Sequence, residues 1–402
     1  MIADPEHAGG KTKVLLVLTS SAGGAGEQAY QLTRDISRDE FDVTVAFGRG
    51  YPLDDDFERS GTRVLYLSLS RQLDPLVNFR GMWQLFRLMR RERYDVVCTS
   101  CSIAGFVGRI AAALAGVPTR IHIIQVYASR PFQPAPRKTF FRWVEKALDH
   151  VTTRYVAVSG AVKQYGVDTG IMAAEKVDVI YNAAELRDPE EGARDRVRRE
   201  LDLDPAGPVI GTLGRFEPQK GLEYFLRAAT LVRAARPAAQ FLIVGDGPLE
   251  QELRALVGEL GLEDAVRFSG WRRDVPDVLA ALDVFCLASL WETFGIVLAE
   301  AMLAELPVVA TAVDGIPEVV ADGHTGFLVP PRDAEALADK LLQLLDDPDQ
   351  AQRMGRAGRK RSLEKFSVAS MVTGYERFLR ALAEEATTAY ASSSRSRTRG
   401  HV

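Results

Sequence analysis

Runs of apolar, β-branched residues alternate with segments of helical period along most of the chain. The helical segments carry apolar residues at i, i+3 and i+4, as in Gly221–Ala234 and Ala334–Leu345. Continuous apolar runs are typical of strands that are buried on both faces of a parallel sheet with helical crossovers. The pattern therefore predicts an α/β fold, with strands at Lys13–Thr19, Asp42–Phe47, Arg63–Leu67, Asp95–Thr99, Arg120–Ile124, Tyr155–Ser159, Val177–Tyr181, Pro208–Leu213, Gln240–Val244, Val266–Ser269, Val284–Leu287, Val308–Thr311 and Gly326–Val329.

The strand pattern is interrupted once and then restarts as a full set. A charged run, Arg187–Glu200, lies at the interruption, and it would fit either a surface helix of a single domain or a boundary between two domains. A length of 402 residues also favours two domains, at roughly 100–200 residues for each. We predict two similar, doubly wound Rossmann-like domains, residues 11–185 and 186–366. A helix follows at 367–386, and residues 1–10 and 387–402 lack an apolar period and are predicted to be disordered tails.

Charge changes this picture more through its distribution than through its total. The net charge of −4 gives no reason to expect a nucleic-acid partner. Residues 60–163, however, hold sixteen Lys and Arg against five Asp and Glu, with aromatic residues between them. Two interpretations stay open: amphipathic helices with solvated basic faces, or a surface that attracts an anionic membrane or a phosphate-bearing substrate.

Cysteine usage and the start of the chain predict the compartment. Three cysteines cannot form a disulfide framework, so a reducing environment is expected. Cys98 and Cys101 form a C-x-x-C, but no second such pair or neighbouring His completes a zinc set. Residues 1–13 lack the apolar core of a secretory signal. We expect a cytoplasmic protein, with peripheral contact to the inner face of the membrane through residues 60–163 under the second interpretation of the charge.

A run of three acidic residues raises the question of a metal. Asp54-Asp55-Asp56 superficially resembles a metal-binding D-x-D. Acidic residues are also favoured in the first turn of a helix, where they complement its dipole. We interpret the run as a solvated helix start, and the sequence predicts no metal site.

A glycine-rich loop follows the first predicted strand. Gly23 and Gly24 open it, and Gly24, Gly26 and Ala29 satisfy the G-x-G-x-x-A pattern of dinucleotide-binding loops. The second strand ends without the acidic residue that would hold a ribose, although Arg49 could accommodate a 2′-phosphate. A nicotinamide-dependent oxidoreductase therefore stays open as an alternative, and otherwise the loop lets a ligand approach the backbone.

Two cations follow the first strand of the second half. Arg215 and Lys220 lie five residues apart around a turn that opens a helix. Cations and free helix amides at the carboxyl end of a parallel strand make a phosphate site, because their field and hydrogen bonds point the same way. The next strand ends in a glycine turn at Gly245, which brings bare backbone to the same edge of the sheet.

A third cluster combines two carboxylates with a helix start. Glu292 precedes a helix predicted to begin near Thr293, and Glu300 is expected two turns inside it. The amides of Phe294, Gly295 and Ile296 would point at a ligand, and Gly295 would let it come close. The segment thus predicts an anion hole with one carboxylate beside it and a second within reach.

Taken in this order, these motifs resemble the retaining nucleotide-sugar glycosyltransferases of family 4, which have the GT-B fold. The resemblance covers roughly residues 13–378 and rests on motifs of both halves: the early Gly-Gly loop, Val156-Ala157-Val158-Ser159, Leu213-Gly214-Arg215, Lys220-Gly221, Val244-Gly245-Asp246-Gly247-Pro248, Phe268-Ser269-Gly270, Glu292-x(7)-Glu300 with Phe294-Gly295, Pro307-Val308-Val309-Ala310-Thr311 and Asp322-Gly323-His324-Thr325-Gly326.

The resemblance implies transfer of a sugar from a nucleoside diphosphate donor, UDP before GDP, with retention at the anomeric carbon. It implies two domains facing a central cleft, with the acceptor on the first and the donor on the second, and a final helix that packs back toward the first. Arg215 and Lys220 would hold the diphosphate, Glu300 the ribose, and Glu292 with the Phe294 and Gly295 amides the transferred sugar and phosphate. The acceptor would be a glycan or a lipid-linked glycan of surface polysaccharide synthesis, and no metal or other cofactor would be required.

Departures from the family pattern concern the acceptor end and one helix end. Gln125 stands where the family usually has a catalytic His, and Gln can donate a hydrogen bond but cannot carry a proton. A catalytically silent sugar-nucleotide-binding protein is therefore a further alternative. Ala183 replaces the usual Gly after Asn182, and Glu305 stands where a Gly is expected, which predicts strain at that helix end.

Overall fold

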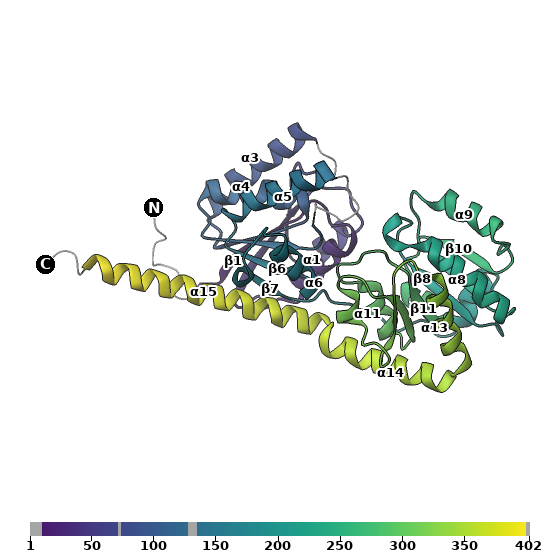
Figure 1. Ribbon diagram of the computed structural model, residues 1–402. Helices are drawn as coiled ribbons and strands as arrows, with labels where there is room; N and C mark the ends of the chain where they lie inside the picture. The colour runs from purple at the N-terminus through teal and green to yellow at the C-terminus, as the bar shows by residue number, and fades with distance from the viewer. Residues whose placement is uncertain (1–9, 71–73, 128–134, 399–402) are drawn as a thin grey trace. The chain divides into compact units, whose positions relative to one another are not determined.

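The computed structural model describes residues 10–70, 74–127 and 135–398, with side chains as far as residue 385. It divides into two compact units (Figure 1). Unit 1 comprises Met1–Tyr181 with Val368–Val402, and unit 2 comprises Asn182–Ser367. The division falls after residue 181, four residues before the boundary that the sequence predicts.

Unit 1 is built on a seven-stranded parallel sheet in the order β3-β2-β1-β4-β5-β6-β7. Every strand that the sequence predicts in this half is present, and no strand end is shifted by more than two residues. The strands are β1 (Thr12–Val17), β2 (Phe41–Phe47), β3 (Arg63–Tyr66), β4 (Val96–Ser100), β5 (Thr119–Ile124), β6 (Arg154–Ala157) and β7 (Val177–Val179).

Helices connect these strands, and several of them bury an apolar side on the sheet. A core of Leu15, Val17, Val97 and Val107 joins β1, β4 and the helix after β4. The helices of unit 1 are α1 (Gly23–Asp35), α2 (Asp54–Arg59), α3 (Pro75–Glu92), α4 (Ser102–Ala115), α5 (Ala135–Asp149), α6 (Gly160–Asp168) and α15 (Val368–Thr398).

The last helix, α15, packs on unit 1 although it lies at the other end of the chain. Tyr375 is fully buried and its hydroxyl lies 3.2 Å from Nε2 of Gln28 in α1. The Glu376 carboxylate accepts a hydrogen bond from the Ser37 amide at 2.9 Å. The helix runs to Thr398, so it extends beyond the predicted 367–386 helix and into the stretch that the sequence assigns to a disordered tail.

Unit 2 has a six-stranded parallel sheet in the order β10-β9-β8-β11-β12-β13. All six predicted strands are present: β8 (Val209–Leu213), β9 (Gln240–Val244), β10 (Val266–Gly270), β11 (Val284–Leu287), β12 (Val308–Thr311) and β13 (Gly326–Val329). The covering helices are α7 (Ala193–Glu200), α8 (Leu222–Ala235), α9 (Glu250–Glu259), α10 (Val275–Ala280), α11 (Ile296–Leu303), α12 (Ile316–Val319), α13 (Ala334–Asp346) and α14 (Pro348–Lys365).

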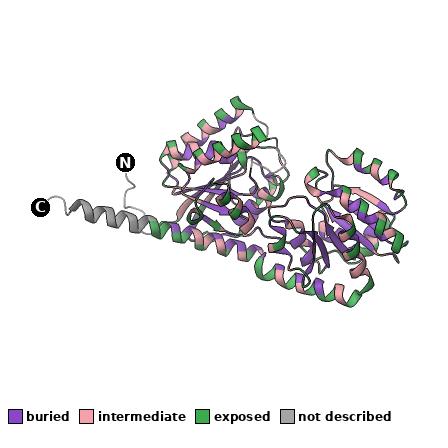
Figure 2. Cartoon of the chain, in the orientation of Figure 1, coloured by how far each residue is buried: buried purple, intermediate pink, exposed green. Residues whose placement is uncertain are grey.

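The strand order reverses once in each sheet, between β1 and β4 and between β8 and β11. Buried strands lie under exposed helix faces in both units (Figure 2). In open parallel sheets, ligands bind outside the carboxyl ends of the strands at such a reversal, because the flanking loops separate there. In unit 2 these loops are residues 214–221 after β8 and 288–295 after β11, the segments that the sequence singles out.

The end of α11 and the lengths of the helices test two properties of the chain. Glu305, which follows α11, has a φ of 58° in the left-handed region, so the predicted strain at this helix end is confirmed. Within the described ranges, no helix combines the length and the apolar character that crossing a bilayer requires.

The interpretation of Asp54 as a solvated residue is wrong. Its side chain is buried and accepts three hydrogen bonds, from Ser21 Oγ at 2.7 Å, the Gly50 amide at 2.7 Å and the Tyr51 amide at 3.1 Å. Asp55 is exposed, as expected. Asp54 therefore connects the loop after β1 to the loop after β2 by hydrogen bonds.

Replacing Asp54 with alanine leaves the buried Ser21 hydroxyl and two amides without this acceptor. We expect Asp54→Ala to lower the free energy of unfolding by about 3 kcal/mol, since each unsatisfied donor costs roughly 1–3 kcal/mol. Asp55→Ala is the matched control, with an expected change within about 0.5 kcal/mol because its side chain is exposed. Urea denaturation of both variants checks this, and equal effects would contradict the role of Asp54.

Candidate functional site

The loop after β8 carries both predicted cations of unit 2, and they lie in different surroundings. Arg215 is 61% exposed and its Nε lies 3.0 Å from a carboxylate oxygen of Glu217. Lys220 ends a short 3₁₀ turn, Pro218–Lys220, and only 17% of its side chain is exposed. The Lys220 stem lies across the backbone of Gly214, where even a Cβ would come within 3.1 Å of Lys220 Cε. The loop thus aims Lys220 inward and leaves Arg215 facing solvent.

Lys220 meets a carboxylate from the loop after β11. Its Nζ lies 2.6 Å from Oε2 of Glu292, and the Glu292 side chain is 11% exposed. Charge-assisted hydrogen bonds of this length are about twice as strong as neutral ones. The sequence predicts both residues at this edge, but it does not predict that they form an ion pair.

The peptide of Glu292 is held from both sides by the loop after β12. Its amide donates to Oδ2 of Asp314 at 3.0 Å, and its carbonyl accepts from the Gly315 amide at 3.0 Å. Partial burial raises the pKa of the Asp314 carboxyl above its ordinary value and the Glu292 charge adds to this, while the hydrogen bond from the Glu292 amide opposes it. Asp314 therefore positions the Glu292 backbone.

This geometry distinguishes two substitutions of Asp314. Asparagine keeps an oxygen that accepts from the Glu292 amide, whereas alanine removes it and frees the loop. We expect Asp314→Ala to lower kcat by about tenfold to a hundredfold, because small displacements of a reacting group cost that much, and Asp314→Asn to keep kcat near the wild-type value. Steady-state kinetics of the two variants measures the difference, and equal losses would contradict a positioning role.

The raised pKa of Asp314 adds a pH dependence to the same comparison. The folded state binds this proton more readily than the unfolded state does, so wild-type stability falls as pH rises through the raised pKa. The Asp314→Asn variant does not lose stability in this way, because asparagine does not titrate. Asp314→Asn should therefore melt above the wild type at neutral pH, with the gap closing in acid, and a gap that widens in acid would contradict this sign.

The helix after Glu292 begins later than predicted. α11 starts at Ile296 rather than near Thr293, and Glu300 is its fifth residue, so it lies one turn inside the helix rather than two. Phe294 is fully buried against the ring of Phe366, with ring centroids 5.2 Å apart. Because the Phe294 side chain is buried in the core of unit 2, the helix begins only after this residue.

Gly295 makes this delayed start possible. Its φ of 85° lies in the left-handed region, and it caps the amino end of α11. A Cβ at this position would also approach Leu298 Cδ1 to 3.2 Å and Glu292 Cγ to 3.4 Å. Thr293, Ile296 and Glu300 are all partly exposed around this turn.

Gly245 has a packing role that the sequence does not predict. Its φ is 131°, and a Cβ here would lie 2.1 Å from the Gly214 carbonyl oxygen. The two loops are also joined by the Phe216 amide, which donates to the Asp246 carbonyl. The close approach of the two loops by itself requires glycine at this position.

In unit 1 the predicted residues follow β1 and β5. Gly23 and Gly24 are exposed at the first turn of α1. Gln125 follows β5, as expected, and its amide donates to Oε1 of Gln28, the residue that also contacts Tyr375. Gln125 is thus joined through α1 to α15, a connection that no sequence motif indicates.

His122, three residues before Gln125, is buried inside the sheet. Its Nδ1 lies 3.0 Å from Thr99 Oγ1. Burial, with the nearby Arg109 charge, lowers its pKa well below the ordinary value. The imidazole is neutral at physiological pH and belongs to the core.

The three cysteines form no disulfide with one another, and Cys98 is buried. Burial raises the pKa of Cys98 to about 12, which disfavours the thiolate that redox chemistry needs. Within the described part of the chain, no group of three or more His, Cys, Asp or Glu side chains is arranged to hold a metal ion.

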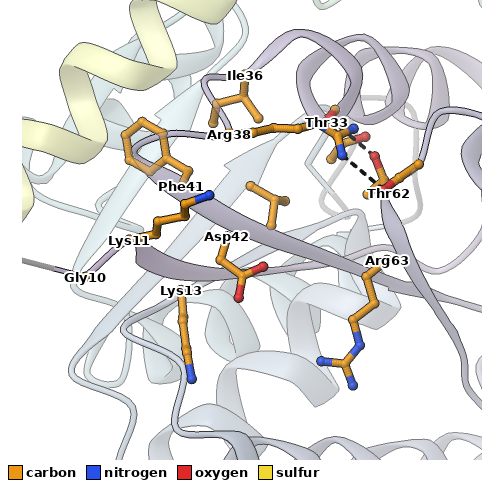
Figure 3. Close-up of a pocket in the computed structure, with 12 residues that line it drawn as sticks. Gly10, Lys11, Lys13, Thr33, Ile36, Arg38, Phe41, Asp42, Thr62 and Arg63 are labelled. Carbon is orange, nitrogen blue, oxygen red and sulfur yellow. Dashed lines mark hydrogen bonds between the residues drawn. The ribbon is translucent and has the colours of Figure 1, made fainter.

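A separate pocket of about 610 Å³ lies at the amino ends of β1 and β2 (Figure 3). Lys11, Lys13, Arg38 and Arg63 line it. Arg38 already donates to the Ser60 and Gly61 carbonyls, and Arg63 is paired with Glu92 at 2.5 Å. None of the residues predicted to form a site lines this pocket, which is at the opposite edge of the sheet from Gly23 and Gln125.

Two family descriptions match the two units. The model for "Glycosyl transferase 4-like domain" matches residues 23–183, and the model for "Glycosyl transferases group 1" matches residues 193–361. The oxidoreductase alternative is therefore wrong. The early glycine loop belongs to a glycosyltransferase domain and not to a nicotinamide site.

Curated relatives and solved structures agree with this assignment. The chain is 31% identical over 329 residues to 2-deoxystreptamine glucosyltransferase of Streptomyces kanamyceticus, covering 76% of this chain and 84% of the relative. It is 29% identical to UDP-Gal:alpha-D-GlcNAc-diphosphoundecaprenol alpha-1,3-galactosyltransferase of Escherichia coli, over 83% and 87% of the two chains. Anabaena HepE in complex with UDP and glucose has the same fold, with a TM-score of 0.81 and 23% identity over 92% and 100% of the two chains. The chain belongs to the family 4 glycosyltransferases and has the GT-B fold.

Proposed function

We propose that the enzyme transfers a sugar from a nucleoside diphosphate donor bound to unit 2, with retention of configuration at the anomeric carbon. The observation that carries the proposal is the Lys220–Glu292 ion pair at the strand-order reversal of the second sheet. A largely buried cation and a buried carboxylate meet there beside the amino end of α11.

The chemistry of the donor explains why these groups suit it. Breaking the glycosyl phosphate bond builds negative charge on the leaving diphosphate and positive charge at the anomeric carbon. Lys220 and the first amides of α11 would stabilise the diphosphate, and fixed charges of this kind lower the barrier most when water is excluded. Glu292, paired with Lys220, would hold the transferred sugar, with Thr293, Phe294, Gly295 and Ile296 forming the turn beside it.

Arg215 and Glu300 complete the proposed donor site. Arg215 would leave Glu217 to contact the diphosphate, since its guanidinium is exposed and free to turn. Glu300 would hold the ribose hydroxyls. Because two cations supply the charge that a divalent metal provides elsewhere, we propose that transfer needs no metal ion or other cofactor.

The donor base is proposed by likeness, with UDP first and GDP next. A relative is named for a UDP-galactose donor, and HepE was solved with UDP. Thermal melting with UDP, GDP and ADP, each alone and as a sugar nucleotide, tests this, because a ligand at a hundred times its Kd stabilises by about 2.7 kcal/mol. Stabilisation by UDP ligands is expected, and preference for GDP or ADP would reassign the base.

Retention is tested separately from donor choice. Proton NMR of the glycoside product reports the configuration at the anomeric carbon of the transferred sugar, because the new glycosidic linkage fixes that configuration. An axial linkage from an α-linked donor is expected, and an equatorial product would contradict retention.

We propose that unit 1 binds the acceptor, a glycan or a lipid-linked glycan used in surface polysaccharide synthesis. The Escherichia coli relative is named for a diphosphoundecaprenol-linked acceptor, which is a lipid. Gly23, Gly24 and Gln125 would lie at this site, and the Gln125 amide would donate a hydrogen bond at the reacting sugar. Peripheral contact with an anionic membrane through residues 60–163 would bring the enzyme to such an acceptor.

The position of Gln125 also keeps a second candidate, a catalytically silent sugar-nucleotide-binding protein. Gln125 cannot carry a proton. Calorimetry separates the candidates, because a silent protein would bind the sugar nucleotide that stabilises it best without releasing nucleoside diphosphate from it.

A further inference from the structure

Exposed apolar side chains are concentrated on three helices of unit 1. Of the ten large apolar side chains that are exposed within the described residues, seven lie on α3, α4 and α5. α4 lies between the other two and contacts both (Figure 1). We name the outer surface of these three helices the α3–α5 face.

On α3 the exposed apolar residues form one stripe. Leu76, Phe79 and Trp83 are spaced i, i+3 and i+7 and are 83%, 64% and 53% exposed, so they lie on one side of the helix. Arg80 and Arg87 continue the same exposed side. A surface helix of a soluble domain normally places polar residues on this side, so this stripe needs a partner.

On α5 the imbalance is larger. Leu148 is the one buried residue of this fifteen-residue helix, all of which the structure describes. Phe140 and Trp143 are 61% and 69% exposed. Arg137 and Lys138 lie beside them, and the Arg137 guanidinium is over the ring of Phe141 at 5.7 Å.

α4 supplies an apolar centre between the two aromatic, basic helices. Phe106 is 44% exposed and Leu114 is 65% exposed, two turns apart along one side of α4. The single cation of α4, Arg109, is buried and paired with Glu145 at 2.8 Å, so it does not contribute to the surface. The α3–α5 face therefore has an apolar middle and basic flanks.

We propose that the α3–α5 face docks on the surface of an anionic phospholipid bilayer. Aromatic and leucine side chains enter the boundary between head groups and acyl chains, while arginine and lysine reach the anionic head groups. Each nearby base adds affinity at a negatively charged surface. The positive charge disfavours a second copy of the chain as the partner, because two such faces would bring basic helices together. It also disfavours a basic or neutral partner.

This inference rests on the proposed membrane contact and deepens it by naming the surface that makes it, but it does not depend on donor transfer. Docking requires no donor and no transfer, and it would hold for a silent protein. The two proposals therefore fail separately: vesicle binding is measured without donor or acceptor, and donor turnover is measured without vesicles.

The full-length protein is tested by sedimentation with vesicles of phosphatidylglycerol and of phosphatidylcholine. We expect binding to the phosphatidylglycerol vesicles that weakens with salt, since exposed charges are screened over about 10 Å at 0.1 M, and little binding to phosphatidylcholine. Blue-shifted tryptophan emission on binding would report entry of Trp83 and Trp143 into the boundary region.

Two pairs of variants carry matched controls in unit 2. Trp83→Ser with Trp143→Ser should weaken vesicle binding about tenfold or more through lost apolar burial, whereas Trp271→Ser, at an equally exposed tryptophan of unit 2, should not. Arg80→Gln with Arg87→Gln should weaken it about thirtyfold at roughly 1 kcal/mol per base. Arg353→Gln with Arg356→Gln on α14 removes the same charge elsewhere and should have little effect.

Several outcomes would overturn the proposal. These are absence of binding to phosphatidylglycerol vesicles, binding that salt does not weaken, and binding that the variant and control pairs change equally. Light scattering provides the remaining check: a dimer that Trp83→Ser with Trp143→Ser dissociates would show that a second copy covers the face instead.

Discussion

Glu292→Gln is expected to lower kcat by about 10²- to 10³-fold, the usual cost of removing one preorganised charged or hydrogen-bonding group. Glutamine preserves the size of the side chain and its main-chain contacts with Asp314 and Gly315. It removes the carboxylate charge and the ion pair with Lys220 at 2.6 Å. The loss should therefore appear in turnover while the fold stays intact.

A matched control for Glu292→Gln is Glu318→Gln. Glu318 lies in the first turn of α12, directly after the loop that contains Asp314 and Gly315. Its main-chain carbonyl accepts a hydrogen bond from the Arg361 side chain. Steady-state kinetics and thermal melting of both variants make the comparison. If the Glu292→Gln variant keeps more than about a tenth of the wild-type kcat, the result would contradict a role of this carboxylate in the reaction.

Lys220→Ala is expected to reduce both donor affinity and turnover. Lys220 is the largely buried cation of the pair, so its removal would take a positive charge from the proposed diphosphate site and leave Glu292 without its ion-pair partner. We expect kcat/KM to fall by about 10³-fold, more than for loss of one neutral donor, because the uncompensated carboxylate would also repel the donor.

The double variant separates these two effects. Because Lys220 and Glu292 are in direct contact, Lys220→Ala combined with Glu292→Gln should cost less than the sum of the two single changes. Lys360→Ala on α14, where the lysine is exposed and pairs only loosely with Glu364 at 3.9 Å, is the control cation. Strict additivity of the single effects would contradict a shared site.

The strands of both sheets could be predicted because most of them are short apolar runs that their neighbours bury on two faces. β9, β11, β12 and β13 begin and end at the predicted residues. That the cations after β8 and the carboxylate after β11 lie at one edge of the sheet could also be predicted, because the carboxyl ends of parallel strands meet at one edge.

What could not be predicted depends on contacts between distant segments. Asp54 is buried because it meets Ser21, 33 residues away in the chain. The Lys220–Glu292 pair joins residues 72 apart, and nothing in their local sequence indicates the side-chain directions that bring them together. The start of α11 differs from the predicted one because Phe294 is buried against Phe366, which is distant in the sequence and which local helix signals do not include.

The most direct test of the donor site is release of nucleoside diphosphate by the full-length enzyme, measured with a panel of UDP-, GDP- and ADP-sugars. We predict release from at least one donor, with UDP-sugars first, that Glu292→Gln and Lys220→Ala both abolish nearly completely. Absence of release from every donor, or release that survives both substitutions, would contradict the assignment of donor transfer to this site.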